Sequence, residues 1–189
     1  LVVGRKGLNP LKDALFGSVA NKLVGRPLHL PVWVVGGAPP VDKLLVALDR
    51  SEQSRRTVAC VEKILASVGR GSEVLLFNVI RGKRAFLPDV GDPNALHQEE
   101  DWVKRAIQEF DKVKSEMQGF FDDVIRGWET NGRHRGRTDS RISWGESRAG
   151  TIVDQARRGG YGTIVVGRKG VTRVEEFFMG RVSSKVLQL

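Results

Sequence analysis

The sequence is short of the residues that build disulfides and metal sites. Cys60 is its only cysteine, so no intramolecular disulfide can form and a cysteine-based metal site is disfavoured. Cys60 lies in an apolar stretch, which indicates a small buried residue and suits a reducing cytoplasm. The three histidines, His29, His97 and His134, lie far apart without ligand spacing. We therefore expect no metal site.

Long apolar runs are also missing. None approaches the roughly 20 residues that a membrane span needs, so we expect no contact with a membrane. The start of the chain lacks the charged region of a signal peptide. It begins at Leu1 and not at Met, which indicates a fragment, a processed product or an incomplete record. A cytoplasmic location is the expectation.

Acidic residues are outnumbered, and the formal net charge is +9. Such a charge favours anionic partners, including nucleic acids and phosphate-bearing ligands. One local cluster, Arg133-His134-Arg135-Gly136-Arg137, stands out. It contains a glycine and no aromatic residue, so a solvated basic loop is favoured over a nucleic-acid contact.

A repeat organises the chain. The hexapeptide VVGRKG occupies residues 2–7 and again residues 165–170. Gly17, Val19 and Lys22 continue the match, because Gly180, Val182 and Lys185 follow the second copy at the same spacing. The sequence therefore predicts two copies of one supersecondary unit.

Each copy is a short β-branched strand that enters Gly-x-x-Gly, followed by nine residues, a third glycine and an apolar-periodic helix. A glycine loop between a buried strand and a helix N-terminus is a good anion site, because its backbone N–H groups point at the ligand. Glycine matters there because a Cβ blocks close approach of a phosphate. The pattern predicts a phosphate-binding loop.

The remaining elements predict the fold class. We expect strands at 43–48, 73–80, 138–144 and 163–166, separated by helices near 51–67, 94–128 and 149–158, with a last helix after Gly180. Ser51 and Ser54 compete as the N-cap of the first of these helices. This order predicts an α/β fold with a doubly wound, Rossmann-like parallel sheet and helices on both faces. Ligands bind such sheets at the carboxyl ends of strands, where Asp49 and the Gly167 loop both fall.

On these motifs the chain resembles the universal stress protein family. ATP-binding members of that family carry an Asp after the first strand and a Gly-x-x-Gly-x₉-Gly-Ser/Thr loop. Residues 42–189 resemble a nearly complete module that lacks only the last strand. Residues 1–37 resemble the closing part of a preceding module: strand, glycine loop, helix and strand. The resemblance implies a tandem protein in which only the C-terminal part of the first module is present.

The resemblance also implies roles at an adenine-nucleotide site. Asp49 is expected to bind the ribose or adenine, with a capping acid at the strand-to-helix turn as the alternative. Lys169 is expected to neutralise phosphate charge, or to be an exposed loop lysine. The adenine slot is expected to be lined by Ala47, Leu48 and Val79, which can equally be plain core. The phosphates are expected to be held by Gly167, Gly170 and Gly180. Further contacts at the helix start are expected from Val182 and Ser183.

The loop departs from the family pattern at one position. Arg181 follows the third glycine, where ATP-binding members have Ser or Thr. A guanidinium is a good phosphate partner, but its bulk can equally fill the pocket. The missing last strand is a second departure, because in the family this edge strand pairs modules. We expect strand 31–36 to pair with, or substitute for, that strand, either within the chain or in a homodimer.

The resemblance implies a cytoplasmic stress-response module that binds ATP, or alternatively ADP or AMP, with Mg²⁺ as a possible companion of the nucleotide. It also implies an unidentified protein partner. The sequence shows no convincing catalytic base or paired metal-binding acids, so at most slow ATP hydrolysis is expected. The alternative is a nucleotide-free dimerisation or interaction module of the same fold.

Overall fold

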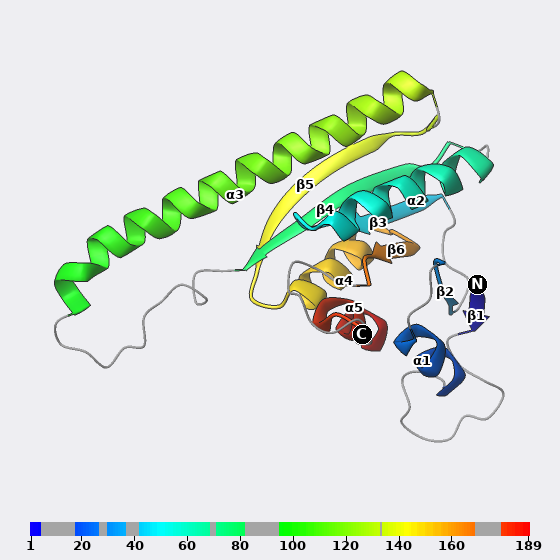
Figure 1. The fold of residues 1–189 in the computed structure, drawn as a ribbon, viewed down its shortest axis with the longest axis horizontal. Coiled ribbons are helices and arrows are strands. Elements are labelled where there is room, and N and C mark those ends of the chain that lie inside the picture. Colours follow the sequence, from blue (N-terminus) through cyan, green and yellow to red (C-terminus); the bar gives the residue numbers. More distant parts are fainter. Residues whose placement is uncertain are drawn as a thin grey trace.

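Helices and parallel strands alternate along the chain, as a computed structural model shows (Figure 1). The structure describes residues 1–4, 18–26, 30–36, 42–68, 71–81, 95–132, 134–168 and 179–189. From residue 42 onward the elements follow the predicted order: β3 (Lys43–Ala47), α2 (Glu52–Val68), β4 (Glu73–Arg81), α3 (Ala95–Asn131), β5 (Thr138–Gly145), α4 (Arg148–Gly159), β6 (Thr163–Val166) and α5 (Arg181–Gln188).

Four of the strands form one parallel sheet in the order β5-β4-β3-β6. The chain adds β4 and then β5 on one side of β3, and returns to place β6 on the other side. The winding therefore reverses between β3 and β6. Residues 74–80 of β4 are all buried, as expected for a strand covered on both faces. The predicted doubly wound α/β fold is confirmed.

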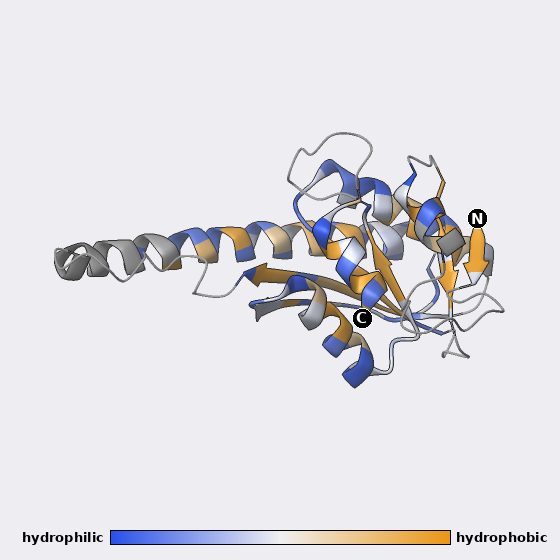
Figure 2. Cartoon of the chain, turned by 90° about the horizontal axis from the view of Figure 1, so that it is seen from below, coloured by the Kyte–Doolittle hydropathy of each residue, from blue (hydrophilic) through white to orange (hydrophobic). Residues whose placement is uncertain are grey.

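Two cores lie on the two faces of this sheet. Successive side chains of a strand point to opposite faces, so Leu44 and Val46 pack with α2 and α3 while Leu45 packs with α4. Phe77 and Phe121 are fully buried, one in each core. Figure 2 shows mostly hydrophobic strands in the middle of the molecule and helices that carry both hydrophobic and hydrophilic faces.

The longest helix described, α3, is longer than the strand of the sheet beside it. Helix α3 has 37 residues, about 55 Å at 1.5 Å per residue. Strand β5 beside it has 8 residues, about 26 Å at 3.3 Å per residue. Figure 1 shows the N-terminal part of α3 extending past the end of the sheet. The exposed fraction of Ile107, in this part of the helix, is 54%.

The first part of the chain forms a separate sheet. Strands β1 (Val2–Gly4) and β2 (Trp33–Val35) pair in parallel, with α1 (Ser18–Gly25) between them in sequence. Within this chain, β2 therefore pairs with β1 and is not a strand of the four-stranded sheet. The physical reason is that β1 offers a parallel ladder close in sequence, with Val3 opposite Val34. Pairing of edge strands between two chains stays a prediction.

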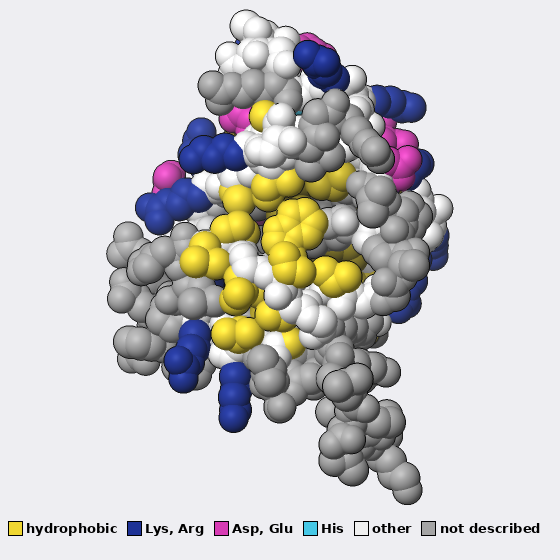
Figure 3. Space-filling view, turned by 90° about the vertical axis from the view of Figure 1, so that its right-hand side faces the viewer, with side chains coloured by type: hydrophobic (Ala, Val, Ile, Leu, Met, Phe, Trp, Pro, Cys, Tyr) yellow, Lys and Arg dark blue, Asp and Glu magenta, His cyan; other side chains and the backbone are white. Residues whose placement is uncertain are grey.

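Hydrophobic side chains gather on the side of the molecule where β1 and β2 lie (Figure 3). Leu1, Val2, Leu30 and Val35 all come from this part of the chain, and their exposed fractions run from 45% to 69%. An apolar patch of this kind marks a contact surface more often than a free one.

Candidate functional site

The reversal of the winding puts two predicted site segments side by side. Ala47 at the end of β3 lies opposite Val166 at the end of β6. Asp49 lies two residues after the end of β3, and Gly167 directly follows β6. The neighbouring carboxyl ends of two strands on either side of such a reversal form the usual ligand crevice of an open α/β sheet.

Asp49 holds the N-terminus of α2. Its Oδ1 accepts hydrogen bonds from the Ser51 N–H at 3.0 Å, from the Ser51 hydroxyl and from the Ser54 hydroxyl at 2.8 Å. Ser51 is the N-cap, because its hydroxyl accepts the N–H of Ser54 at 3.3 Å. The capping role of Asp49 is therefore real. No described residue donates to its Oδ2, so that oxygen is available to a ligand.

Asn78 fixes the end of β3, and no pattern in the sequence singles this residue out. It is buried in β4, and its Nδ2 donates to the carbonyl of Leu48 at 2.7 Å. The Leu48 N–H in turn donates to the Phe77 carbonyl at 2.9 Å. These two bonds hold Leu48, and hence the turn at Asp49, against β4.

The predicted phosphate loop is closed at its base. The carbonyl of Arg168 accepts the Gly180 N–H at 2.7 Å and lies 3.1 Å from the hydroxyl of Ser183. Ser183 is 2% exposed, and its hydroxyl also lies 3.0 Å from the Gly180 carbonyl. The two ends of the loop thus meet where β6 ends and α5 begins. Lys169 and Gly170 lie outside the described residues.

Helix α5 begins at this closure with no side-chain cap. Gly180 is its N-cap residue, in an extended conformation, and makes no side-chain hydrogen bond because it has no side chain. The first N–H groups of a helix need acceptors from elsewhere, and the helix dipole favours an anion there. Arg181 is the first helical residue, and its side chain is exposed.

Four of the five predicted residues of the adenine slot and helix start are packed in the cores. Leu48 lies in the core under α2 and α3, whereas Val79 lies in the core under α4, with Ala47 and Val182 packed against the same cluster. Leu48 and Val79 are 4% and 6% exposed. Their side chains therefore belong to the hydrophobic cores on the two faces of the sheet.

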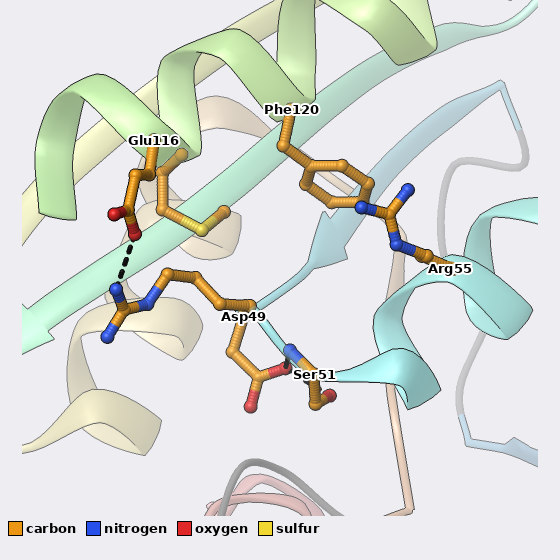
Figure 4. A pocket seen from close by; sticks show the side chains of 7 residues that line it. Asp49, Ser51, Arg55, Glu116 and Phe120 are labelled. Atoms are coloured by element: carbon orange, nitrogen blue, oxygen red, sulfur yellow. Dashed lines mark hydrogen bonds and ion pairs between the residues drawn. The ribbon is translucent and has the colours of Figure 1, made fainter.

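A pocket lies on the α2–α3 side of the same turn. Its volume is about 190 Å³, and Asp49, Arg50, Ser51, Arg55, Glu116, Met117 and Phe120 line it. Figure 4 shows the carboxylate of Asp49 pointing away from α3. Arg50 forms an ion pair with Glu116 of α3. The pair joins residues that are 66 positions apart, so no local pattern in the sequence indicates it.

In the described part of the chain, no three His, Cys, Asp or Glu side chains gather in a way that could hold a metal ion. None of the helices described is both long enough and apolar enough to span a membrane.

The fold and the crevice together define a doubly wound α/β domain with a glycine-ended loop and a helix N-terminus at the reversal of its winding. Residues 40–189 match the model of the Universal stress protein family. The chain belongs to this family.

Solved structures agree with this assignment at the level of the fold. The hypothetical protein MJ0577 is 21% identical, with a TM-score of 0.59, covering 79% of this chain and 90% of that chain. The universal stress protein UspA from Lactobacillus plantarum is 17% identical, with a TM-score of 0.54, covering 80% of this chain and 92% of that one. A universal stress protein from Archaeoglobus fulgidus is 19% identical, with a TM-score of 0.54, covering 99% of this chain and 56% of that one. No curated protein matches the chain.

Proposed function

We propose that the chain is a stress-response module that binds an adenine nucleotide, ATP foremost, in the crevice between the ends of β3 and β6. The observation that carries this proposal is the position of the reversal in winding. It puts Asp49, whose Oδ2 accepts no hydrogen bond from a described residue, beside the end of the strand that leads into the glycine loop.

The chemistry of the crevice suits the two ends of a nucleotide. At one end, Oδ2 of Asp49 can accept a hydrogen bond from a ribose hydroxyl or an exocyclic amine. At the other, the uncapped start of α5 offers backbone N–H groups to a phosphate, and Arg181 adds a positive charge. These charged groups suit binding of a nucleotide more than catalysis. We therefore propose a regulatory role, with slow hydrolysis at most, in the cytoplasm.

The test is calorimetric titration of ATP into the protein and into Asp49→Asn. Asparagine keeps an oxygen for the hydroxyls of Ser51 and Ser54, so α2 stays capped, but the anionic acceptor for the nucleotide is lost. A hydrogen bond to a charged group contributes about 1.5–3 kcal/mol, so we expect ATP affinity to fall roughly ten- to hundredfold. Mass spectrometry of nucleotide released from the purified protein provides a second reading.

Asp42→Asn is the matched control. Asp42 is exposed and directly precedes β3, at the opposite end of the strand that Asp49 follows. Its substitution is expected to leave ATP affinity unchanged. If the parent protein gave no heat at millimolar ATP, the nucleotide-free interaction module would replace this proposal.

We also propose that residues 1–37 are the closing part of a preceding module. The internal repeat supports this, because the same hexapeptide starts within β1 and within β6 and each strand is followed by a helix. The Archaeoglobus fulgidus structure supports it as well, since nearly the whole of this chain matches about half of that longer one. Contact between such modules, within a chain or in a homodimer, belongs to the same proposal.

A further inference from the structure

A groove separates α2 from α3 on the face of the sheet opposite α4 and α5. The pocket at the Asp49 turn shares Arg55 and Phe120 with an adjoining pocket of about 220 Å³ that Val58, Asp123 and Val124 also line. Each volume lies below the roughly 300 Å³ of the smallest drug-sized sites, so the groove suits a small molecule. Met117, which is fully buried, and Phe120 give it an apolar floor.

Among the described residues that line this groove, Arg55 is an exposed arginine without an ion-pair partner, whereas Arg50 is paired. Its guanidinium lies over the Phe120 ring, 5.4 Å from the centroid, and no described carboxylate forms an ion pair with it. The acids nearby are already engaged: Glu116 pairs with Arg50, and Asp123 pairs with Arg126 at 3.5 Å. A guanidinium that gives one face to a ring still has its N–H edge free for a bidentate carboxylate.

We propose that the groove binds a small apolar monocarboxylate. The carboxylate pairs with the N–H edge of Arg55, and the apolar body lies against Phe120 and above Met117. A single negative charge is favoured over a phosphate dianion, because the carboxylates of Glu116 and Asp123 line the same groove and repel a second charge.

This site is separate from the nucleotide crevice and does not rest on the proposed function. The Asp49 carboxylate points away from α3, whereas Arg55 and Phe120 point toward one another across the groove (Figure 4). Val79 and Val182, next to the crevice, pack on the other face of the sheet. The two sites meet only at the turn that carries Asp49 and Ser51.

The probe is para-fluorobenzoate, followed by fluorine NMR, with para-fluorobenzamide as its neutral counterpart. A ligand of this size is expected to bind with a Kd on the order of 1 mM. Because the charge of Arg55 is the proposed anchor, the amide is expected to bind roughly tenfold more weakly or not at all. Equal binding of the acid and the amide overturns the proposal.

Two neighbouring arginines provide the variants. Arg55→Gln removes the proposed anchor and is expected to weaken para-fluorobenzoate binding roughly tenfold or more. Arg56→Gln removes the next charge along α2, which pairs weakly with Glu52 and does not line the groove. It is expected to bind like the parent. Equal loss of affinity in both variants indicates a general charge effect and contradicts the assignment.

The two methionines locate the ligand in the unmodified protein. Met117 lines the groove, whereas Met179 directly precedes Gly180 at the nucleotide loop. In methyl NMR spectra, para-fluorobenzoate is expected to shift the Met117 signal and leave that of Met179 in place. ATP is expected to do the reverse. Absence of a saturable Met117 shift rules out the groove site whatever ATP does.

Discussion

At the scale of single residues, Asp49 illustrates how one side chain serves both fold and site. Its Oδ1 takes the three hydrogen bonds that start α2, and its Oδ2 takes none from a described residue. The two interpretations of this acid, capping residue and nucleotide ligand, are therefore compatible. A substitution that removes the whole side chain would mix the two effects, which is why the conservative asparagine is the informative change.

Arg181 is the residue of the proposed phosphate site that departs from the family pattern. If the guanidinium is a phosphate ligand, Arg181→Gln weakens ATP binding roughly tenfold, the loss expected for one charge-assisted hydrogen bond. The remaining affinity also depends less on salt, because one exposed charge is gone. Titration calorimetry at low and high sodium chloride measures both effects. Tighter ATP binding by Arg181→Ser than by the parent would show instead that the arginine obstructs the pocket.

His134 is expected to make stability depend on pH. Its Nε2 is buried and has no hydrogen-bond partner among the described residues, and its ring meets the edge of Trp128. Burial lowers the pKa of His134, partly offset by a hydrogen bond with the Arg137 backbone. Below the unfolded pKa of about 6.5 the unfolded chain takes up a proton that the folded chain resists. The free energy of unfolding therefore falls as the pH drops from above 6.5 to the lower folded pKa.

The variant His134→Phe isolates this contribution. Phenylalanine keeps a ring beside Trp128 but does not titrate, so its free energy of unfolding should change less between pH 7 and pH 5. Urea unfolding of parent and variant across this range measures the difference. Parallel pH profiles for the two proteins would show that His134 is not the group responsible.

At the scale of elements, the join between β3 and β4 depends on Asn78. Asn78→Ala leaves the carbonyl of Leu48 without its buried donor, so we expect a loss of about 1–3 kcal/mol in the free energy of unfolding. Asn131→Ala, at the exposed end of α3, is the control and should change stability by no more than about 0.5 kcal/mol. Denaturant unfolding compares them. An effect of Asn78→Ala as small as that of the control would show that water replaces the lost bond.

Element types were predictable because their signals are local. The apolar period of α3 and the β-branched runs of β3, β4 and β6 lie within single stretches of sequence. The end of α4 at Gly160 was predictable too, because the residue after a helix often has a left-handed conformation, here with φ 67°, which favours glycine. Contacts between distant segments were not predictable. The ion pair of Arg50 with Glu116, for example, joins two segments that share no sequence pattern.

At the scale of the whole molecule, residues 42–189 are expected to fold alone. Both cores are built entirely from residues between Leu44 and Val186. Deletion of residues 1–41 should therefore keep one cooperative thermal transition, with Tm lowered by no more than about 4 °C per kcal/mol of lost contacts. Differential scanning calorimetry of the two chains tests this. Loss of the cooperative transition would make the first 41 residues part of one folding unit.

The sequence by itself determined the fold class, the repeat and the types of residue at the strand ends, because hydrophobic periodicity, glycine spacing and β-branched runs are local properties. Only the tertiary structure decided which strand ends lie side by side, that one oxygen of Asp49 caps α2 while the other stays available, and that β2 pairs with β1. It also decided that Arg55 meets Phe120 over a groove. These depend on packing between segments far apart in the chain, where many residue pairs are chemically compatible and the fold selects one.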